Sequence, residues 1–182
     1  FATGMGSTDV AALMHTGKTW LKVPATIKVE FTGRLPAATA AKDLILFLVG
    51  QLGTSGANYQ AIEYSGEAVE SLTLAGRMTL ASMSVEMGAK SGIVDPRGLQ
   101  LPYPFEPMWA DADAHYEKVY QFDVSDLSSQ ISLPHSPDKV VPLEEVRGTS
   151  IDVAFIGTCT NGRLEDLQAA ADILQGQKIA PH

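Results

Sequence analysis

Cys159, the one cysteine of the chain, lies where a thiol could do chemistry. Ile151 to Gly157 has the length and apolar character of a buried strand, and Arg163 to Leu174 reads as a helix. Thr158 to Gly162 would then be a tight turn that places the thiol at a helix N-terminus, where the helix dipole and free N–H groups lower its pKa. Such a thiolate could be a nucleophile or a soft metal ligand. A small buried hydrophobic residue is the alternative.

Ser82 and Glu86 form a second candidate pair for chemistry. Both fall in Gly76 to Lys90, which is predicted to be one strong helix. Residues four apart share one face of an α-helix, so the hydroxyl and the carboxylate would point the same way. A carboxylate can transfer a proton, and a hydroxyl can donate and accept hydrogen bonds. The alternative for Glu86 is an exposed helix carboxylate.

Other polar residues are expected to have structural roles. Asn161 and Arg163 would shape the cysteine turn through hydrogen bonds, and Arg77 could pair with Glu67 or Glu70. Three histidines show no spacing typical of metal ligands and are treated as non-catalytic: His15, His115 and His135.

Alternating helix and strand patterns predict an α/β fold made of layered α/β/α units with partly parallel sheets. Further helices are predicted at Asp9–Thr16, Ala37–Leu52 and Gly66–Leu72, and strands at Pro24–Leu35 and Tyr59–Tyr64. The first α/β unit would span 1–95, and a second would begin at 143–182. Residues 96–142 hold seven of the ten prolines and would connect the units, with a helical turn at His115–Tyr120 and a strand at Tyr120–Val124.

The composition limits the classes of function. The net charge of −8 argues against a nucleic-acid partner, because phosphate binding needs clustered Lys and Arg. No apolar run approaches the roughly 18 residues of a membrane span. One cysteine rules out an internal disulfide and does not suggest a secreted scaffold, so a cytoplasmic location is expected. The chain opens on Phe1 in what reads as the middle of a motif, and a fragment is expected.

Three motifs resemble the aconitase superfamily and follow its order over nearly the whole chain. They are Gly4-Met-Gly-Ser-Thr-Asp9 with Lys22 to Gly33, then Glu63 to Leu72 with Gly76 to Lys90, and Phe155-Ile-Gly-Thr-Cys-Thr-Asn-Gly-Arg163. The resemblance implies an iron–sulfur domain of aconitase type. It also implies a 4Fe-4S cluster held by three cysteine thiolates, in which an iron without a protein ligand acts as a Lewis acid.

The resemblance assigns roles to three residues. Cys159 matches the first cluster ligand, and Glu86 matches a helix glutamate near the reacting water or hydroxyl, where it would shuttle a proton. Ser82 stands where many members have a hydrogen-bonding asparagine, so this substrate contact departs from the family pattern. With one of three cysteine ligands, the chain by itself is expected to be inactive.

Within the superfamily, Phe1 to Asp9 and Gly17 to Trp20 look like the large subunits of two-subunit 3-isopropylmalate dehydratases. This implies dehydration and rehydration of 2-isopropylmalate and 3-isopropylmalate in leucine biosynthesis, with a small partner subunit that reads the variable arm of the hydroxy acid. Large subunits of homoaconitase and dimethylmalate dehydratase are the nearest alternatives. An RNA-binding module of the same superfamily and an enzyme with Cys159 as nucleophile are the alternatives from other classes.

Overall fold

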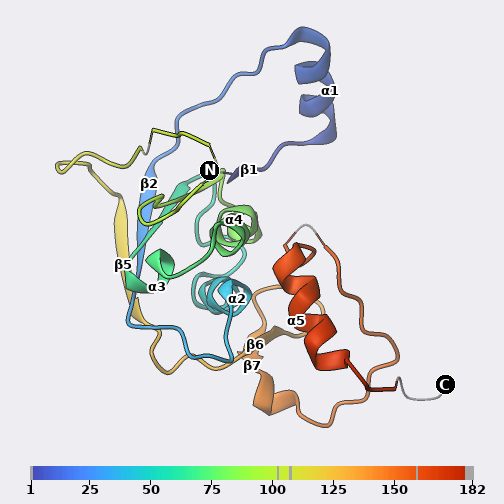
Figure 1. The fold of residues 1–182 in the computed structure, drawn as a ribbon. Helices are drawn as coiled ribbons and strands as arrows, with labels where there is room; N and C mark the ends of the chain where they lie inside the picture. The colour runs from blue at the N-terminus through green and yellow to red at the C-terminus, as the bar shows by residue number, and fades with distance from the viewer. Residues whose placement is uncertain (1, 102, 107, 159, 179–182) are drawn as a thin grey trace.

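A mostly parallel sheet is the centre of the computed structural model, which describes residues 2–101, 103–106, 108–158 and 160–178. Its five strands lie in the order β1-β4-β3-β2-β5 (Figure 1). They are β1 (Ala2–Thr3), β2 (Thr26–Thr32), β3 (Ala61–Ser65), β4 (Ser91–Val94) and β5 (Lys118–Asp123). Strand β1 pairs antiparallel with β4, and the other neighbours pair parallel. The predicted α/β class with a partly parallel sheet is confirmed.

Helices α2 and α4 cover one face of this sheet. The helical elements are α1 (Ser7–Thr16), α2 (Ala41–Leu52), α3 (Glu67–Glu70), α4 (Leu74–Met83), α5 (Leu164–Leu174) and two 3₁₀ turns, η1 (Ser84–Met87) and η2 (Leu143–Val146). Residues of β2, β3, α2 and α4 that are at most 1% exposed form the core: Ile27, Val29, Phe31, Leu44, Ile45, Leu48, Val49, Ile62, Tyr64 and Leu80. A short antiparallel pair, β6 (Gln130–Ser132) and β7 (Val140–Pro142), packs beside α2.

The opposite face of the sheet carries several polar side chains. Side chains alternate between the two faces of a strand, so Glu30 and Glu63 point away from the core. The Tyr116 hydroxyl donates to Glu63 Oε1 at 2.8 Å, and Gln121 Nε2 donates to Glu30 Oε2 at 2.7 Å. Burial and the neighbouring Glu63 carboxylate raise the pKa of Tyr116 to about 12. These bonds attach β5 to β2 and the segment before β5 to β3.

The connecting segment 96–142 supplies part of the sheet. Strand β5 lies within it and pairs with β2 at the sheet edge. The helical turn expected at His115–Tyr120 is wrong, because His115 and Tyr116 are not helical and the strand begins at Lys118. The division into 1–95, 96–142 and 143–182 remains a prediction about domains.

The strand expected at Ile151–Gly157 is also wrong, because residues 151–157 have no strand structure. A strand needs a hydrogen-bonded neighbour, and none lies beside this segment among the described residues. Ile151, Val153 and Phe155 are 72%, 79% and 77% exposed. The helix predicted to follow is confirmed as α5.

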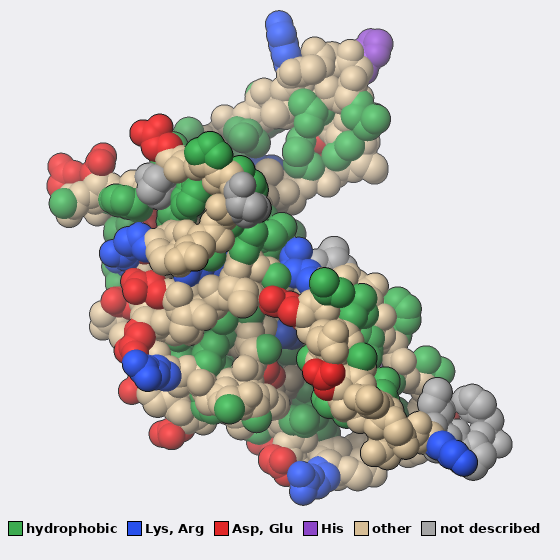
Figure 2. All heavy atoms as spheres, viewed as in Figure 1, with side chains coloured by type: hydrophobic (Ala, Val, Ile, Leu, Met, Phe, Trp, Pro, Cys, Tyr) green, Lys and Arg blue, Asp and Glu red, His purple; other side chains and the backbone are tan. Residues whose placement is uncertain are grey.

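Helices α1 and α5 bury no residue, in contrast to α2. Helix α1 stands away from the sheet (Figure 1), and apolar side chains lie open on both helices (Figure 2). Met14 on α1 and Leu164 on α5 are each 83% exposed. The well-packed part of the chain is therefore the sheet with α2, α3 and α4.

Candidate active site

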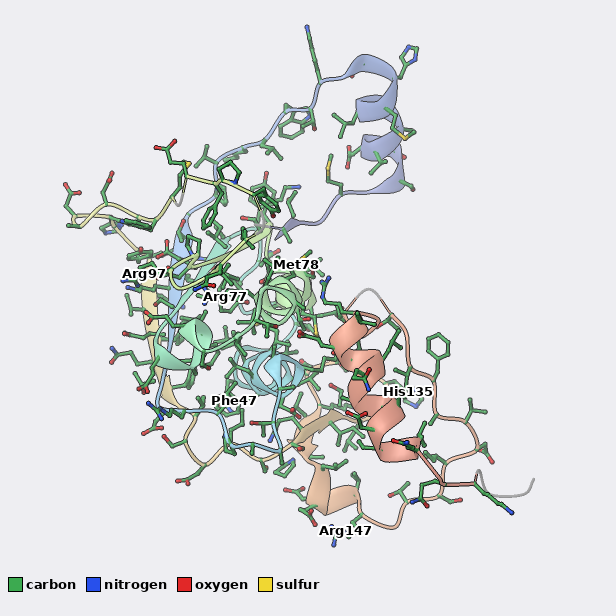
Figure 3. The ribbon with its side chains drawn as sticks, viewed as in Figure 1. Phe47, Arg77, Met78, Arg97, His135 and Arg147 are labelled. Carbon is green, nitrogen blue, oxygen red and sulfur yellow. The ribbon has the colours of Figure 1, made fainter. Side chains whose placement is uncertain are left out.

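Ser82 lies in the last turn of α4 and lines two adjoining shallow cavities of about 150 and 200 Å³. Ala2 and Ala81 border both. The smaller is completed by Thr3, Ser84 and residues around Lys90, and the larger by Arg77, Met78 and Pro96. Arg77 and Met78 are labelled around α4 in Figure 3. Ser82, which is half-buried, therefore lies where the two cavities meet.

Glu86 lies beyond the end of α4, in the 3₁₀ turn η1, and its side chain is exposed. The predicted helix Gly76–Lys90 therefore ends early, at Met83. A 3₁₀ turn has 3.0 residues per turn instead of 3.6, so Glu86 is rotated away from the helical stripe through Ser82. No hydrogen bond or ion pair joins the Glu86 side chain to another described residue. The proposed roles of Ser82 and Glu86 stay predictions.

The glycine motif at the start of the chain lies next to the Glu86 turn. Thr3 Oγ1 donates to the Lys90 carbonyl at 2.7 Å, and Lys90 Nζ donates to the Gly4 carbonyl at 3.2 Å. A Cβ on Gly4 would be 3.3 Å from Val85 Cγ2, so the backbone passes close to η1. Two of the three motifs that resemble the family are thus joined at the C-terminal end of α4.

The third motif contacts α4 one turn away from Ser82. Thr79 Oγ1 donates to the Thr160 carbonyl at 3.2 Å, and Lys42 Nζ donates to Thr160 Oγ1 at 3.0 Å. Thr73 Oγ1 donates to the Glu165 carboxylate at 2.9 Å and accepts from Gly76 N at 3.1 Å. Cys159 itself lies outside the described residues, so its predicted orientation stays a prediction.

Asn161 and Arg163 shape the turn as expected. Asn161 N donates to the Thr158 carbonyl at 3.1 Å, and Asn161 Nδ2 reaches Asp166 Oδ1 at 3.3 Å. Arg163 N donates to Asp166 Oδ2 at 3.0 Å, which caps the first turn of α5. The turn is therefore held by the helix that follows it.

Arg77 differs from its prediction, because its guanidinium meets backbone carbonyls instead of a carboxylate. It is 3% exposed and donates to the carbonyls of Glu70 at 2.8 Å, Leu72 at 3.2 Å, Arg97 at 2.7 Å and also Asp95. Figure 3 shows Arg77 and Arg97 close together beside α4.

The two glutamates considered for Arg77 pair with other arginines. Glu67 pairs with Arg34 at 3.0 Å, and Glu70 with Arg97 at 3.6 Å. Arg77 thus ties the segment after β4 to α4 and forms part of the wall of the larger cavity near Ser82.

Asp95 supports the same wall. Burial alone would raise the pKa of its carboxyl, but hydrogen bonds from Arg97 and the charges of Arg97 and Arg77 outweigh burial and lower the pKa below its usual value. Arg97 Nε donates to Asp95 Oδ2 at 2.7 Å. The carboxylate therefore stays charged at neutral pH.

A metal centre is not complete among the described residues, which contain no group of three His, Cys, Asp or Glu side chains able to hold an ion. The full sequence has one cysteine, whereas a four-iron cluster needs three or four protein ligands. These 182 residues can offer one thiolate and do not fit a whole cluster. No helix of the described residues is long and apolar enough to cross a membrane.

The Aconitase family (aconitate hydratase) matches residues 1–150 and 144–182, so the chain belongs to this family. It is 50% identical over 98% of its length to the 3-isopropylmalate dehydratase large subunit 1 of Methanopyrus kandleri, and covers 44% of that protein. It is 47% identical to a probable methanogen homoaconitase large subunit of Methanosarcina mazei, and the match covers 98% of this chain and 48% of that protein. A 3-isopropylmalate dehydratase large subunit of Oleidesulfovibrio alaskensis is 48% identical, and the match covers 98% of this chain and 44% of that protein.

The chain thus spans about half the length of the curated relatives that it matches.

Proposed function

We propose that the chain is part of the large subunit of a hydro-lyase that interconverts 2-isopropylmalate and 3-isopropylmalate by dehydration and rehydration. The observation that carries this proposal is the 50% identity, over 98% of the chain, to a 3-isopropylmalate dehydratase large subunit. Contacts of the glycine motif and the cysteine turn with α4 and its continuation support it, because Ser82 and Glu86 lie on those elements.

In the proposed reaction, a carbon–hydrogen and a carbon–oxygen bond on neighbouring carbons break, and an alkene acid and water form. Water then adds back with the hydroxyl on the other carbon. Glu86 exchanges a proton with the reacting hydroxyl or water, for which an exposed carboxylate with no hydrogen-bond or ion-pair partner among the described residues is suited. Ser82 binds the substrate through its hydroxyl at the cavity wall.

A 4Fe-4S cluster is proposed for the complete enzyme, with Cys159 as one thiolate ligand. When bound, such a cluster supplies Lewis acidity toward the substrate oxygens. The other ligands would come from outside these 182 residues. We also propose a small-subunit partner, which the words "large subunit" in the names of the relatives support, and a cytoplasmic location. Neither a nucleic acid nor a membrane is part of the proposed function.

Homoaconitase activity is the second candidate, because the probable homoaconitase large subunit of Methanosarcina mazei is 47% identical, nearly as similar as the dehydratases. The test is turnover of the full-length protein with its small subunit, assembled without oxygen. We expect rapid equilibration of 2-isopropylmalate and 3-isopropylmalate. The reaction is monitored through the absorbance of the alkene acid. Faster turnover of the homoaconitase substrate would favour the second proposal over the first. Turnover of neither substrate would contradict the hydro-lyase assignment.

A further inference from the structure

The turn that carries Glu86 is fixed by its backbone, since no described residue contacts the Glu86 side chain through a hydrogen bond or ion pair. On one side, Ala57 N donates to the Met87 carbonyl at 3.0 Å and Tyr59 N donates to the Gly88 carbonyl at 2.9 Å. These bonds hold the end of η1 against the loop before β3. The turn η1 starts at Ser84, so the contacts that hold Ser84 determine where Glu86 lies.

Ser84 is buried, with 1% of its surface exposed, and its hydroxyl bridges α4 and β3. Ser84 Oγ donates to the Leu80 carbonyl at 3.1 Å, and it lies 2.8 Å from the Tyr64 hydroxyl. Because the serine proton is used toward Leu80, Tyr64 is the donor of the second bond. The result is a chain of two hydrogen bonds from Tyr64 through Ser84 to the helix backbone.

This chain of hydrogen bonds coincides with the end of the α-helix. A serine that donates to the carbonyl four residues earlier bends a helix, because its hydroxyl competes for the acceptor of the regular ladder. Helix α4 changes to a 3₁₀ turn at this residue. A Cβ on Gly92 would lie 2.4 Å from Ser84 Oγ, so the backbone of β4 closes the space around the hydroxyl.

Tyr64 is well suited to hold Ser84. It lies in the core with 0% exposure, and burial raises the pKa of its phenol far above the usual value. The phenol therefore remains a neutral donor at neutral pH. Its rigid ring extends from β3 and fixes the distance between the sheet and the turn.

We propose that Ser84 and Tyr64 are positioning residues for Glu86: their hydrogen bonds end α4 at Met83 and set the 3₁₀ turn that aims the carboxylate. This proposal rests on the proposed function of Glu86. The proposed role of both residues is indirect, through Glu86. They act through the backbone of η1, where a displacement of about 1 Å of a reacting group can cost up to about 100-fold in rate.

The test uses the full-length enzyme with its small subunit and compares Ser84→Ala and Tyr64→Phe. We expect each to lower kcat about tenfold with KM changed less than about twofold. Ser65→Ala is the matched control, because Ser65 is also buried, adjoins Tyr64 and has a buried hydroxyl that meets no hydrogen-bond partner in the described part of the chain. It should leave kcat unchanged. Tyr64→Phe is the decisive variant if Ser84→Ala does not fold, since it keeps Ser84 and its bond to Leu80.

A second comparison separates positioning from general stability. In a Glu86→Gln background, Ser84→Ala and Tyr64→Phe should lower kcat no further, because there is no carboxylate left to aim. Equal losses in both backgrounds, or an unchanged kcat in the single variants, would overturn the proposal while leaving the role of Glu86 intact. Full turnover of Glu86→Gln alone would instead refute the proposed role of Glu86, and the positioning proposal with it.

Discussion

Replacing Arg77 by methionine should destabilise the chain by about 3–5 kcal/mol, the range for removing one partner of a buried charged network. Methionine fills much of the same space but cannot donate to the carbonyls of Glu70, Leu72, Asp95 and Arg97. Each hydrogen bond of a charged group contributes about 1.5–3 kcal/mol, and the four are not additive because they share one guanidinium. Arg77→Lys keeps the charge but lacks the planar guanidinium fork, so this variant should also lose a large part of the stabilisation.

The assay is equilibrium urea unfolding of the 182-residue chain, followed by circular dichroism. Arg34→Met is the matched control, because the side chain of Arg34 is 88% exposed and its ion pair with Glu67 lies on the surface. Such a pair contributes about 0–1 kcal/mol. If Arg77→Met changed the free energy of unfolding by no more than the control, the hydrogen bonds from Arg77 to the carbonyls would add no measurable stability. That result would refute the prediction.

Three further predictions concern packing, acid stability and cluster content. Gly92→Ala should cost about 1–3 kcal/mol of unfolding free energy, because its Cβ would lie 2.5 Å from the Ala81 carbonyl oxygen and collide with Ser84; unchanged urea unfolding would contradict this close approach. The folded-state pKa of Asp95 is lowered, so its charge stabilises the fold above the ordinary pKa of about 3.9 and this stability is lost as the pH falls through the lower folded value. Acid titrations should therefore show a steeper loss of stability below about pH 4 in the unmodified chain than in Asp95→Asn, and identical slopes would be the contrary result. The 182-residue chain alone, with one cysteine, should bind no four-iron cluster after anaerobic reconstitution, and iron and sulfide analysis giving four irons per chain would refute this.

Periodicity predicted the elements that face one continuous core. In β2 the buried residues alternate with half-buried ones, and α2 presents a broad apolar face to the same core. For α2 the predicted start was four residues early, because Ala40 N is capped by Asp43 Oδ2 at 2.8 Å and regular helix begins after that cap. Local patterns were sufficient here because local and tertiary preferences agree.

The early end of α4 could not be predicted from local pattern. Val85 and Met87 continue the apolar character of the helix, and the change to a 3₁₀ turn coincides with the contact between Ser84 and Tyr64, which are 20 residues apart. The same limitation applies to Arg77, whose carbonyl partners include Asp95 and Arg97 in the segment after β4. Long-range hydrogen bonds of this kind leave no periodic signal in a sequence.

The segment 151–157 shows the opposite failure, in which a strong local pattern has no tertiary partner. Its apolar residues have strand character, yet no described strand lies beside them to complete the hydrogen bonds. The candidate site was predicted largely by resemblance, through Ser82, Glu86 and Cys159, and these roles stay predictions. Sequence reasoning missed Ser84, Tyr64 and the contact of Thr160 with Thr79 and Lys42.

Cys159 and Glu86 are proposed to be separate parts of one hydro-lyase site, and cluster content measured beside turnover tests this proposal most directly. In the full-length enzyme with its small subunit, Cys159→Ser should lose both the stable cluster and activity, because a serine oxygen is a poor replacement for a soft thiolate. Glu86→Gln should keep the iron and sulfide content and lose about 10²–10⁴-fold in rate. Full cluster content and normal turnover in Cys159→Ser, or normal turnover in Glu86→Gln, would contradict the claim.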